Sequence, residues 1–269
     1  MVELRPRRVS AIYLRLLVQS VKSLLEYKLN FFVLVAGGLL INILSFVFIS
    51  ALFSKIPAIK GWTFWEVILI YALVIFAEGI NQLFCDGVSI LAAVVYFGEM
   101  DFYLVRPLSP IVQLSTAWFA PLGVGNIAFG SFLGATALVK LDPAWSIGKA
   151  TYAVVVIASA VTIRISLQLA LHSSGFWLRH SPMNRFAISM NGLYNFVRYP
   201  ITIYALAVQA IIVAAVPVAF VSFFPAAFLI GKQHWEIGGL LTPLAAVYAV
   251  FLARWLFYRG LHHYESVSG

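Results

Sequence analysis

Apolar residues occur along this chain in long blocks that are separated by short polar segments. The first block, Phe31–Phe53, has 23 residues and no charged side chain. A helix of that length can cross a bilayer core of about 30 Å. Because lipid offers no hydrogen-bond partners, each crossing segment must satisfy its own backbone groups, and a helix does so. The pattern therefore predicts an all-α membrane protein.

Five blocks are long enough and apolar enough to be membrane-spanning helices. Each has at least the roughly 20 residues that a crossing requires, with few charged side chains. The segments between them contain proline, glycine or charged residues, which are typical of turns and loops. The five predicted spans are Phe31–Phe53, Phe64–Phe84, Ile111–Val139, Ala150–Trp177 and Gly238–Phe257.

Local signals add detail to the second and third spans. Thr63 and Glu66 have the spacing of an N-terminal capping box for the second span. Pro121 should kink the third span, because proline cannot donate a backbone N–H. Gly130 and Gly134 lie four residues apart in the same span, a spacing that lets a neighbouring helix approach closely. The third span is therefore expected to be kinked and tightly packed.

The stretch 186–230 is apolar but broken by prolines, and the sequence leaves its structure open. It has 45 residues and must contain an odd number of crossings if the whole chain has an even number. One alternative is a helix that ends near Arg198, followed by a crossing at Ile203–Phe220. The other is a short span at Phe186–Pro200, followed by two short helices that enter from the outer side and return, with a break at Pro217. Such a re-entrant hairpin must be buried in protein or line a water-filled cavity.

Lysine and arginine are distributed unevenly between the two sides of these spans. With the N-terminus inside, the inner side carries eleven of them and the outer side five. Cytoplasmic loops are enriched in these residues, so both termini are predicted to be cytoplasmic and the number of spans to be even. A chain of 269 residues can hold about six spans, and we expect six in the inner (plasma) membrane. The eleven are Arg5, Arg7, Arg8, Arg15, Lys22, Lys28, Arg106, Arg179, Arg185, Arg254 and Arg259, and the five are Lys55, Lys60, Lys140, Lys149 and Lys232.

The residues before the first span form a predicted amphipathic helix at 10–28. Leucine and valine side chains fall on one face at helical spacing, and Arg15, Lys22 and Glu26 fall on the other. A basic helix of this kind lies in the headgroup layer of a membrane. Residues 1–30 are therefore expected to be a cytoplasmic lead-in with an interfacial helix.

Composition excludes most classes of soluble protein. Apolar residues make up 62% of the 269 residues, charged residues make up 10%, and the mean hydropathy is +0.95. Six spans leave no room for a soluble domain of about 100 residues, so residues 1–269 are expected to form one transmembrane domain. The net charge of +8 is attributed to cytoplasmic loops and anionic membrane lipid, and not to nucleic acid.

No pattern in the sequence indicates an enzyme, a metal site or a bound cofactor. His, Glu and Asp do not cluster at metal-ligand spacing, and no Ser–His–Asp arrangement is recognisable. Neither Gly148-Lys149 nor Gly231-Lys232 has the glycine five residues earlier that a P-loop requires. If ATP drives this protein, ATP and Mg²⁺ must bind to another polypeptide.

The segment Gly98–Pro110, with the sequence GEMDFYLVRPLSP, resembles the Gly-Asp-Leu-Asp…Arg-Pro-(Val/Leu)-Ser-Pro segment of ABC-2 type transporter permeases. The resemblance continues in the motif RYP-x-x-x-Y at Arg198–Tyr204 and in Val216–Phe220. It covers almost the whole chain and fits the small single-domain subfamily. One departure is the stretch Ala92–Phe97, which is apolar where family members often carry basic residues.

This resemblance implies the six-span membrane subunit of an ABC exporter. The subunit would form a homodimer or a related heterodimer and sit on two copies of an ATP-binding subunit that bind ATP and Mg²⁺. The resemblance also implies an outer re-entrant hairpin at 201–230. In the polar segment 85–110, Val88–Phe97 can form a short helix that Gly98 would end, and the resemblance favours a cytoplasmic coupling loop there over an ordinary solvated loop. The coupling residues would be Gly98, Glu99, Asp101, Arg106 and Pro107, and the outer gate would contain Tyr199, Pro200, Tyr204, Pro217 and Phe220.

Glu78 and Arg164 are charged residues inside the second and fourth predicted spans. A charge near the membrane centre costs at least about 2.5–3.5 kcal/mol, so such residues usually face a partner or a cavity. The two can pair with each other, which is a structural role, or line a translocation path. An alternative function is a secondary transporter that uses them as an ion or proton relay. The scarcity of other buried charge favours an amphiphilic substrate on a shallow, lipid-facing path.

Overall fold

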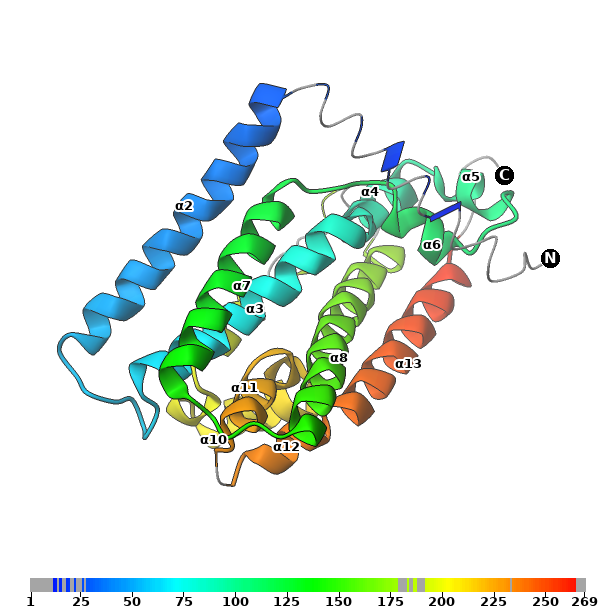
Figure 1. Ribbon diagram of the computed structural model, residues 1–269. Helices are drawn as coiled ribbons and strands as arrows, with labels where there is room; N and C mark the ends of the chain where they lie inside the picture. The colour runs from blue at the N-terminus through cyan, green and yellow to red at the C-terminus, as the bar shows by residue number, and fades with distance from the viewer. Residues whose placement is uncertain are drawn as a thin grey trace.

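The computed structural model describes residues 28–178, 192–232 and 234–264, together with positions 12, 13, 15, 18, 19, 22, 26, 183, 186 and 187. Regular secondary structure within these residues is helical (Figure 1). Five helices are long enough and apolar enough to cross a membrane, which agrees with the five predicted blocks. They are α2 (Lys28–Phe53), α3 (Phe64–Phe84), α7 (Leu122–Leu141), α8 (Ile147–His172) and α13 (Thr242–Leu261).

Helix α3 is the central helix of the bundle, and α2 lies at its edge (Figure 1). Thirteen of the 21 residues of α3 are buried, against α7, α8 and the short helices that follow residue 192. Only three of the 26 residues of α2 are buried, namely Gly38, Asn42 and Ile49. Most of the apolar surface of α2 is therefore available to lipid or to another protein.

Glycines allow α3 and α7 to pack in close contact. A Cβ atom added to Gly123 would lie 2.7 Å from the carbonyl oxygen of Gly79, and one added to Gly130 would lie 2.9 Å from the backbone nitrogen of Phe76. No real Cβ atom tolerates these distances, so glycine is required at both positions. The predicted close approach at Gly130 is confirmed, with α3 as the neighbour, whereas Gly134 makes only ordinary contact.

The predicted start of the third span, at Ile111, was wrong. Helix α7 starts at Leu122, and the preceding apolar residues form a separate short helix, α6 (Pro110–Ser115). Pro121 is the N-cap of α7 and does not kink it. Proline disfavours helical geometry in the residue before it, so a helix that contains Pro121 starts there more easily than it continues through it. The N–H of Ala120 instead donates to the carbonyl of Gln82 in α3, at 3.1 Å.

The region from residue 192 to residue 240 consists of short elements, each shorter than a membrane crossing. A regular helix at Ile203–Phe220, which one alternative required, is not formed. The expected break at Pro217 is confirmed, since a π-helical turn ends just before it and the N–H of Val216 donates to the carbonyl of Ile211 at 2.8 Å. The elements are η3 (Gly192–Arg198), η4 (Ile201–Ile203), α10 (Leu206–Ala210), η5 (Ile211–Ala215), η6 (Val218–Val221), α11 (Phe223–Ile230) and α12 (Glu236–Leu240).

The short helices gather at the two ends of the bundle (Figure 1). At one end, a buried cluster that includes Met100, Phe176 and Phe257 joins the short helices after α3 to the ends of α8 and α13. At the other end lie α10, α11 and α12. The helices at the first end are η1 (Asp86–Ile90), α4 (Leu91–Tyr96), α5 (Met100–Leu104), α6 and η2 (Ser173–Phe176). We call these two ends the α4–α6 end and the α10–α12 end.

Two sequence predictions fall largely outside the described residues. The first is the interfacial helix at 10–28, of which eight positions, Lys28 included, are described as helical and one, Tyr13, donates to the carbonyl of Phe84. The second is the basic loop at 178–185, where Arg179, His180 and Arg185 are not described. The basic residues Arg5, Arg7 and Arg8 also lie outside the described part of the chain.

Candidate functional site

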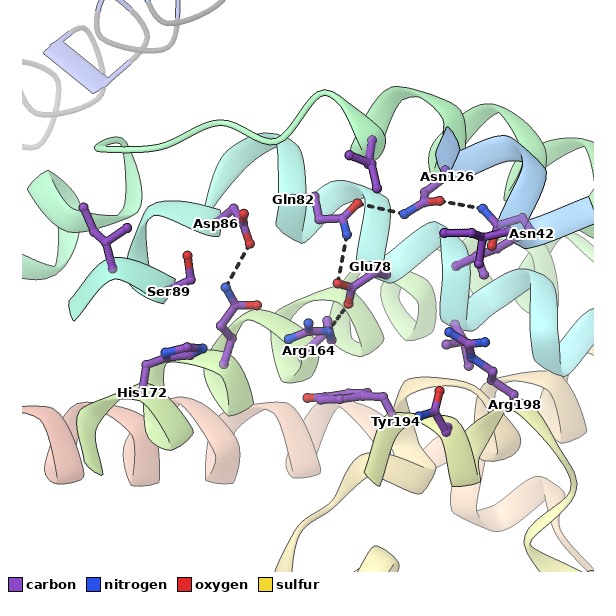
Figure 2. Close-up of a pocket in the computed structure, with 18 of the residues that line it drawn as sticks. Asn42, Glu78, Gln82, Asp86, Ser89, Asn126, Arg164, His172, Tyr194 and Arg198 are labelled. Atoms are coloured by element: carbon purple, nitrogen blue, oxygen red, sulfur yellow. Dashed lines mark hydrogen bonds and ion pairs between the residues drawn. The ribbon is translucent and has the colours of Figure 1, made fainter. Parts of the chain in front are cut away.

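A cavity of about 680 Å³ lies between the long helices, and polar residues from every one of its walls line it (Figure 2). Helices α2, α3, α7 and α8 form most of the wall, and η1, α4, η3 and Met183 contribute the rest. Apolar residues such as Ile41, Val74 and Leu122 also border it. Pockets that bind small molecules have this mixture of an apolar wall and a few converging polar groups.

A row of hydrogen-bonded amides crosses one wall of the cavity. Asn42 of α2 donates to Asn126 of α7 at 2.6 Å, and Asn126 donates to Gln82 of α3 at 2.7 Å. Gln82 then donates to the Glu78 carboxylate at 3.2 Å, one helical turn earlier in α3. Hydrogen bonds of this kind hold helices together where water is scarce. The row attaches the otherwise exposed helix α2 to α7 and α3.

Glu78 and Arg164 form an ion pair at the centre of the site. Nε of Arg164 donates to Oε2 of Glu78, and the arginine side chain is 4% exposed while the glutamate is 29% exposed. The Arg164 guanidinium also lies 4.2 Å from the ring centroid of Tyr194 in η3, a cation–π contact. The pairing that the sequence allowed is therefore formed, and the pair also borders the cavity, while its place in a translocation path stays a prediction.

A second polar branch lies towards the α4–α6 end. Asn81 of α3 donates to Gln168 of α8, and Gln168 donates to Oδ1 of Asp86 at 3.2 Å. Asp86 is in η1, just beyond the end of α3. Burial raises the pKa of the Asp86 carboxyl, and the hydrogen bond from Gln168 lowers it again in part. This branch links α8 to the first residues of the predicted coupling loop.

The predicted coupling loop is built on a helix end of the expected kind. The N–H of Gly98 donates to the carbonyl of Val95, the N–H of Glu99 donates to that of Val94, and Gly98 has φ of 72°. This is a Schellman motif, which needs a residue in the left-handed region and so favours glycine. The prediction that Gly98 ends a short helix is confirmed, with that helix divided into η1 and α4.

One side of the predicted coupling loop packs against the helix bundle, and the other side is exposed. Met100 is completely buried in the cluster with Phe176 and Phe257. The side-chain amide of Gln113 donates to the carbonyls of Tyr103 and Leu108, each at 2.8 Å. The exposed side combines charged and apolar residues, namely Phe97, Glu99, Phe102, Val105, Arg106 and Pro107, while Asp101 is half-buried.

The predicted outer-gate residues lie on the short elements after residue 198. Tyr199 borders a second, smaller cavity, and Pro200 is buried at the start of η4. The hydroxyl of Tyr204 donates to the carbonyl of Phe196 at 2.9 Å. Pro217 separates η5 from η6, and the Phe220 ring lies 4.5 Å from that of Phe224. Tyr199, Tyr204 and Phe220 pack against the main hydrophobic core, and the role of the five residues as a gate stays a prediction.

Sequence reasoning missed most of the polar residues of the cavity. The single available signal was that several amide side chains fall inside apolar blocks, where polar groups are costly and usually have a purpose. Met100 was missed because nothing in the loop sequence separates a buried methionine from an exposed one. The missed cavity residues are Asn42, Gln82, Asp86, Asn126, Gln168 and Tyr194, together with Asn81, which donates to Gln168 from behind the lining.

Comparison with known proteins identifies one family. The family model described as "ABC-2 family transporter protein" matches residues 39–268, which include the cavity and the predicted coupling loop. No curated protein and no solved structure matches the chain.

Proposed function

This chain belongs to the ABC-2 transporter family and is an integral membrane protein with a permease role, and we propose that it is the translocating subunit of an ATP-driven exporter. Family membership implies association with an ABC ATP-binding subunit. In the proposed assembly two such subunits bind ATP and Mg²⁺, and this chain supplies the path through the membrane.

The observation that best supports this function is the polar cavity itself. It lies between helices that would cross the membrane, and it contains a buried ion pair and a row of amides where lipid-facing helices would have none. Polar groups at membrane depth are costly, and in transport proteins they face the substrate path. We therefore infer that the cavity is part of the translocation path.

The predicted coupling loop supplies a mechanical link from the ATP-binding subunit to the cavity. The exposed residues around Phe102 and Arg106 would contact the partner, and Met100 would carry its movement into the cluster with α8 and α13. Helix α8 bears Arg164 and Gln168 on the cavity wall. A movement of this loop would therefore reach the ion pair through one helix, and ATP binding would favour one of two arrangements of the cavity.

The segment after residue 177 fits a fifth crossing in broken form, followed by an outer hairpin. Trp177 lies against His263 at the α4–α6 end, and Tyr194 lies against Arg164 beside the cavity. Leu206 then begins the short helices of the α10–α12 end (Figure 1). Residues 206–230 turn at Pro217 and remain at that end, which supports a re-entrant hairpin. Together with the five long helices this crossing would make six spans and put both termini on the same side, which the excess of lysine and arginine assigns to the cytoplasm.

The exposed surface of α2 supports a dimer. Phe32, Leu40, Leu44 and Phe48 of this helix are each more than half exposed, and α2 borders the cavity. A second permease subunit, either the same chain or a related one, would cover this surface and close the cavity from the side. Lipid is the alternative covering.

Co-purification tests the proposed function directly. The tagged full-length chain, isolated from its native membrane in mild detergent, should carry an ATP-binding protein with a P-loop, identified by mass spectrometry. That complex should hydrolyse ATP, and the chain alone should not. Transport by the chain alone in vesicles, driven by an ion gradient and lost in Glu78→Gln, would refute an ATP-driven exporter and favour the relay.

A further inference from the structure

Arg198 is a cation at the cavity wall without a carboxylate partner among the residues that the structure describes. It lies at the end of η3, half-buried, and its Nε atom has no hydrogen-bond partner in that part of the chain. The ion pairs found there join Arg164 to Glu78 and Lys232 to Glu66, and neither includes Arg198. A desolvated guanidinium with an unused donor attracts an anion.

Arg164 has a second unused donor in the same cavity. Its Nε is bound to Glu78, but its Nη1 is buried and has no partner among the described residues. The ring of Tyr194 lies against the guanidinium and fixes its orientation. In Figure 2 Arg164 lies between Asp86 and Arg198, with its partner Glu78 beside it. An anion between Arg164 and Arg198 would therefore lie on the side of Arg164 away from the Asp86 carboxylate, in a part of the cavity that the paired Glu78 also borders.

An apolar groove continues from the cavity at Arg198. It has a volume of about 320 Å³ and shares two lining residues, Ile41 and Arg198, with the polar cavity. Leu44, Phe48 and Ile49 of α2 form one side of it, and Tyr71 and Tyr199 form the other. The site therefore has a cationic part and an apolar part in direct continuity.

We propose that this composite site binds an amphiphile with an anionic head, such as a phosphate, and a single apolar tail. The head lies between Arg164 and Arg198, and the tail lies in the groove along α2. The head supplies the selectivity, because a tail that moves from lipid to an apolar groove gains little. This inference deepens the proposed transport function by naming the class of substrate, and it rests on that function only for the step of transport.

Binding of three probes to the purified full-length chain tests the head. The probes are dodecyl phosphate, dodecyltrimethylammonium and inorganic phosphate, titrated calorimetrically in the neutral detergent dodecyl maltoside. We expect dodecyl phosphate to bind and the other two not to bind. Equally tight binding of inorganic phosphate would reduce the site to a free-anion site, and equally tight binding of the ammonium probe would remove any charge selectivity. Either result overturns the proposal.

Matched variants assign the binding to this site. Arg198→Gln removes the unpaired cation without breaking the Glu78–Arg164 ion pair, and should weaken dodecyl phosphate binding about 10- to 100-fold, as expected for a lost charge-assisted hydrogen bond. Arg254→Gln is the control, because Arg254 is an exposed arginine on α13 away from the cavity lining. Equal effects of the two substitutions, or no effect of Arg198→Gln, would refute the assignment.

The position of the tail is tested by photolabelling. Dodecyl phosphate with a diazirine at the chain end should label residues 41–49 of α2, and Arg198→Gln should abolish this label. Labelling spread equally over α2 and α13 would indicate contact with bulk lipid and would refute the placement of the tail in the groove.

The transport step is tested in the complex with its ATP-binding subunit. Dodecyl phosphate should stimulate ATP hydrolysis in the complex with the unaltered chain but not in the complex with Arg198→Gln. Binding without any stimulation would refute the substrate class and leave the permease role intact. Failure to isolate a complex would instead count against the proposed function, whereas the binding experiments do not depend on that complex.

Discussion

The side chain of Lys232, just after α11, reaches both carboxylate oxygens of Glu66 at the start of α3. Its Nζ atom lies 2.7 Å from Oε1 and 2.8 Å from Oε2, and it also donates to the carbonyl of Gly61 at 2.8 Å. Glu66 completes the capping box of α3 by accepting from the N–H of Thr63, at 2.8 Å. One ion pair therefore joins the α10–α12 end to the central helix of the bundle.

Loss of this ion pair should loosen the α10–α12 end. Glu66→Gln keeps the capping box, which glutamine also supports, but removes the charge. We expect a loss of about 1–2 kcal/mol in the free energy of unfolding, between the values of exposed and buried pairs, because both side chains are partly exposed. Thermal unfolding of the detergent-solubilised chain measures it. Lys55→Gln, at an exposed lysine outside any ion pair with the described residues, should have a smaller effect, and equal effects would contradict the assignment.

The buried pair of Glu78 and Arg164 should show strong coupling. Glu78→Gln leaves a guanidinium that is only 4% exposed without its partner, which should cost about 3–5 kcal/mol. Arg164→Gln should cost less, because the remaining glutamate is 29% exposed and retains the hydrogen bond from Gln82. The double variant should recover much of the loss. Unfolding measured for all four proteins gives the coupling energy, and a value of zero would exclude a stabilising pair.

Charge reversal in the coupling loop should uncouple the chain from its ATP-binding subunit. Asp101→Arg combined with Arg106→Glu should leave the protein inserted in the membrane but weaken the complex or its transport-stimulated ATP hydrolysis. A loss of about tenfold in affinity corresponds to 1.4 kcal/mol, a reasonable cost for polar contacts at an interface. Unchanged affinity and unchanged hydrolysis would remove these two residues from the coupling mechanism.

An aromatic substitution in the same loop has a closely matched control. Phe102 in α5 and Phe132 in α7 are each 65% exposed, but only Phe102 is on the coupling loop. Phe102→Ala should weaken association with the ATP-binding subunit, because aromatic anchors contribute much of the binding energy of protein interfaces. Phe132→Ala should leave association unchanged. If the two substitutions weaken the complex equally, a general loss of exposed apolar surface is responsible, and Phe102 has no specific role in association.

The orientation of the chain and the hairpin can be tested by cysteine labelling in intact cells, after Cys85 is replaced by serine. Single cysteines at Lys60 and Asp142, which are exposed in the connections α2–α3 and α7–α8, should react with an impermeant thiol reagent from outside, and one at His263 should not. Leu206 and His234 should also react from outside if both legs of the hairpin belong to the outer side. Reaction of His263 from outside would reverse the orientation.

The stability of the α3–η1 junction should depend on pH through Asp86. Burial raises the pKa of this carboxyl above the ordinary value of 3.8, so the folded chain binds more protons than the unfolded chain between the two values. The contribution of Asp86 to stability is therefore greatest below pH 3.8 and is lost as pH rises through the raised pKa. Asp86→Asn keeps an acceptor for Gln168. The free energy of unfolding of this variant, relative to that of the unaltered chain, should increase with pH across this window. Parallel pH profiles of the two proteins would contradict this.

The sequence by itself determined the long helices and several of their local features. Apolar blocks of crossing length with few charged side chains identified α2, α3, α8 and α13, because lipid leaves an apolar segment few structures besides a helix. Local rules also predicted the capping box at Thr63, the helix end at Gly98 and the break at Pro217. These features depend on residues close together in the chain, so they can be predicted without knowledge of the tertiary structure.

Only the tertiary structure decided what the polar residues do. Asn42, Gln82 and Asn126 lie on three helices and meet because glycines bring α3 and α7 together and the amides hold α2 against them. The start of α7 at Leu122 was misplaced because the residues before Pro121 are apolar enough for a span but pack as a separate helix. Contacts between residues about 40 to 90 positions apart depend on how helices pack, and periodicity along one helix carries no information on its neighbour.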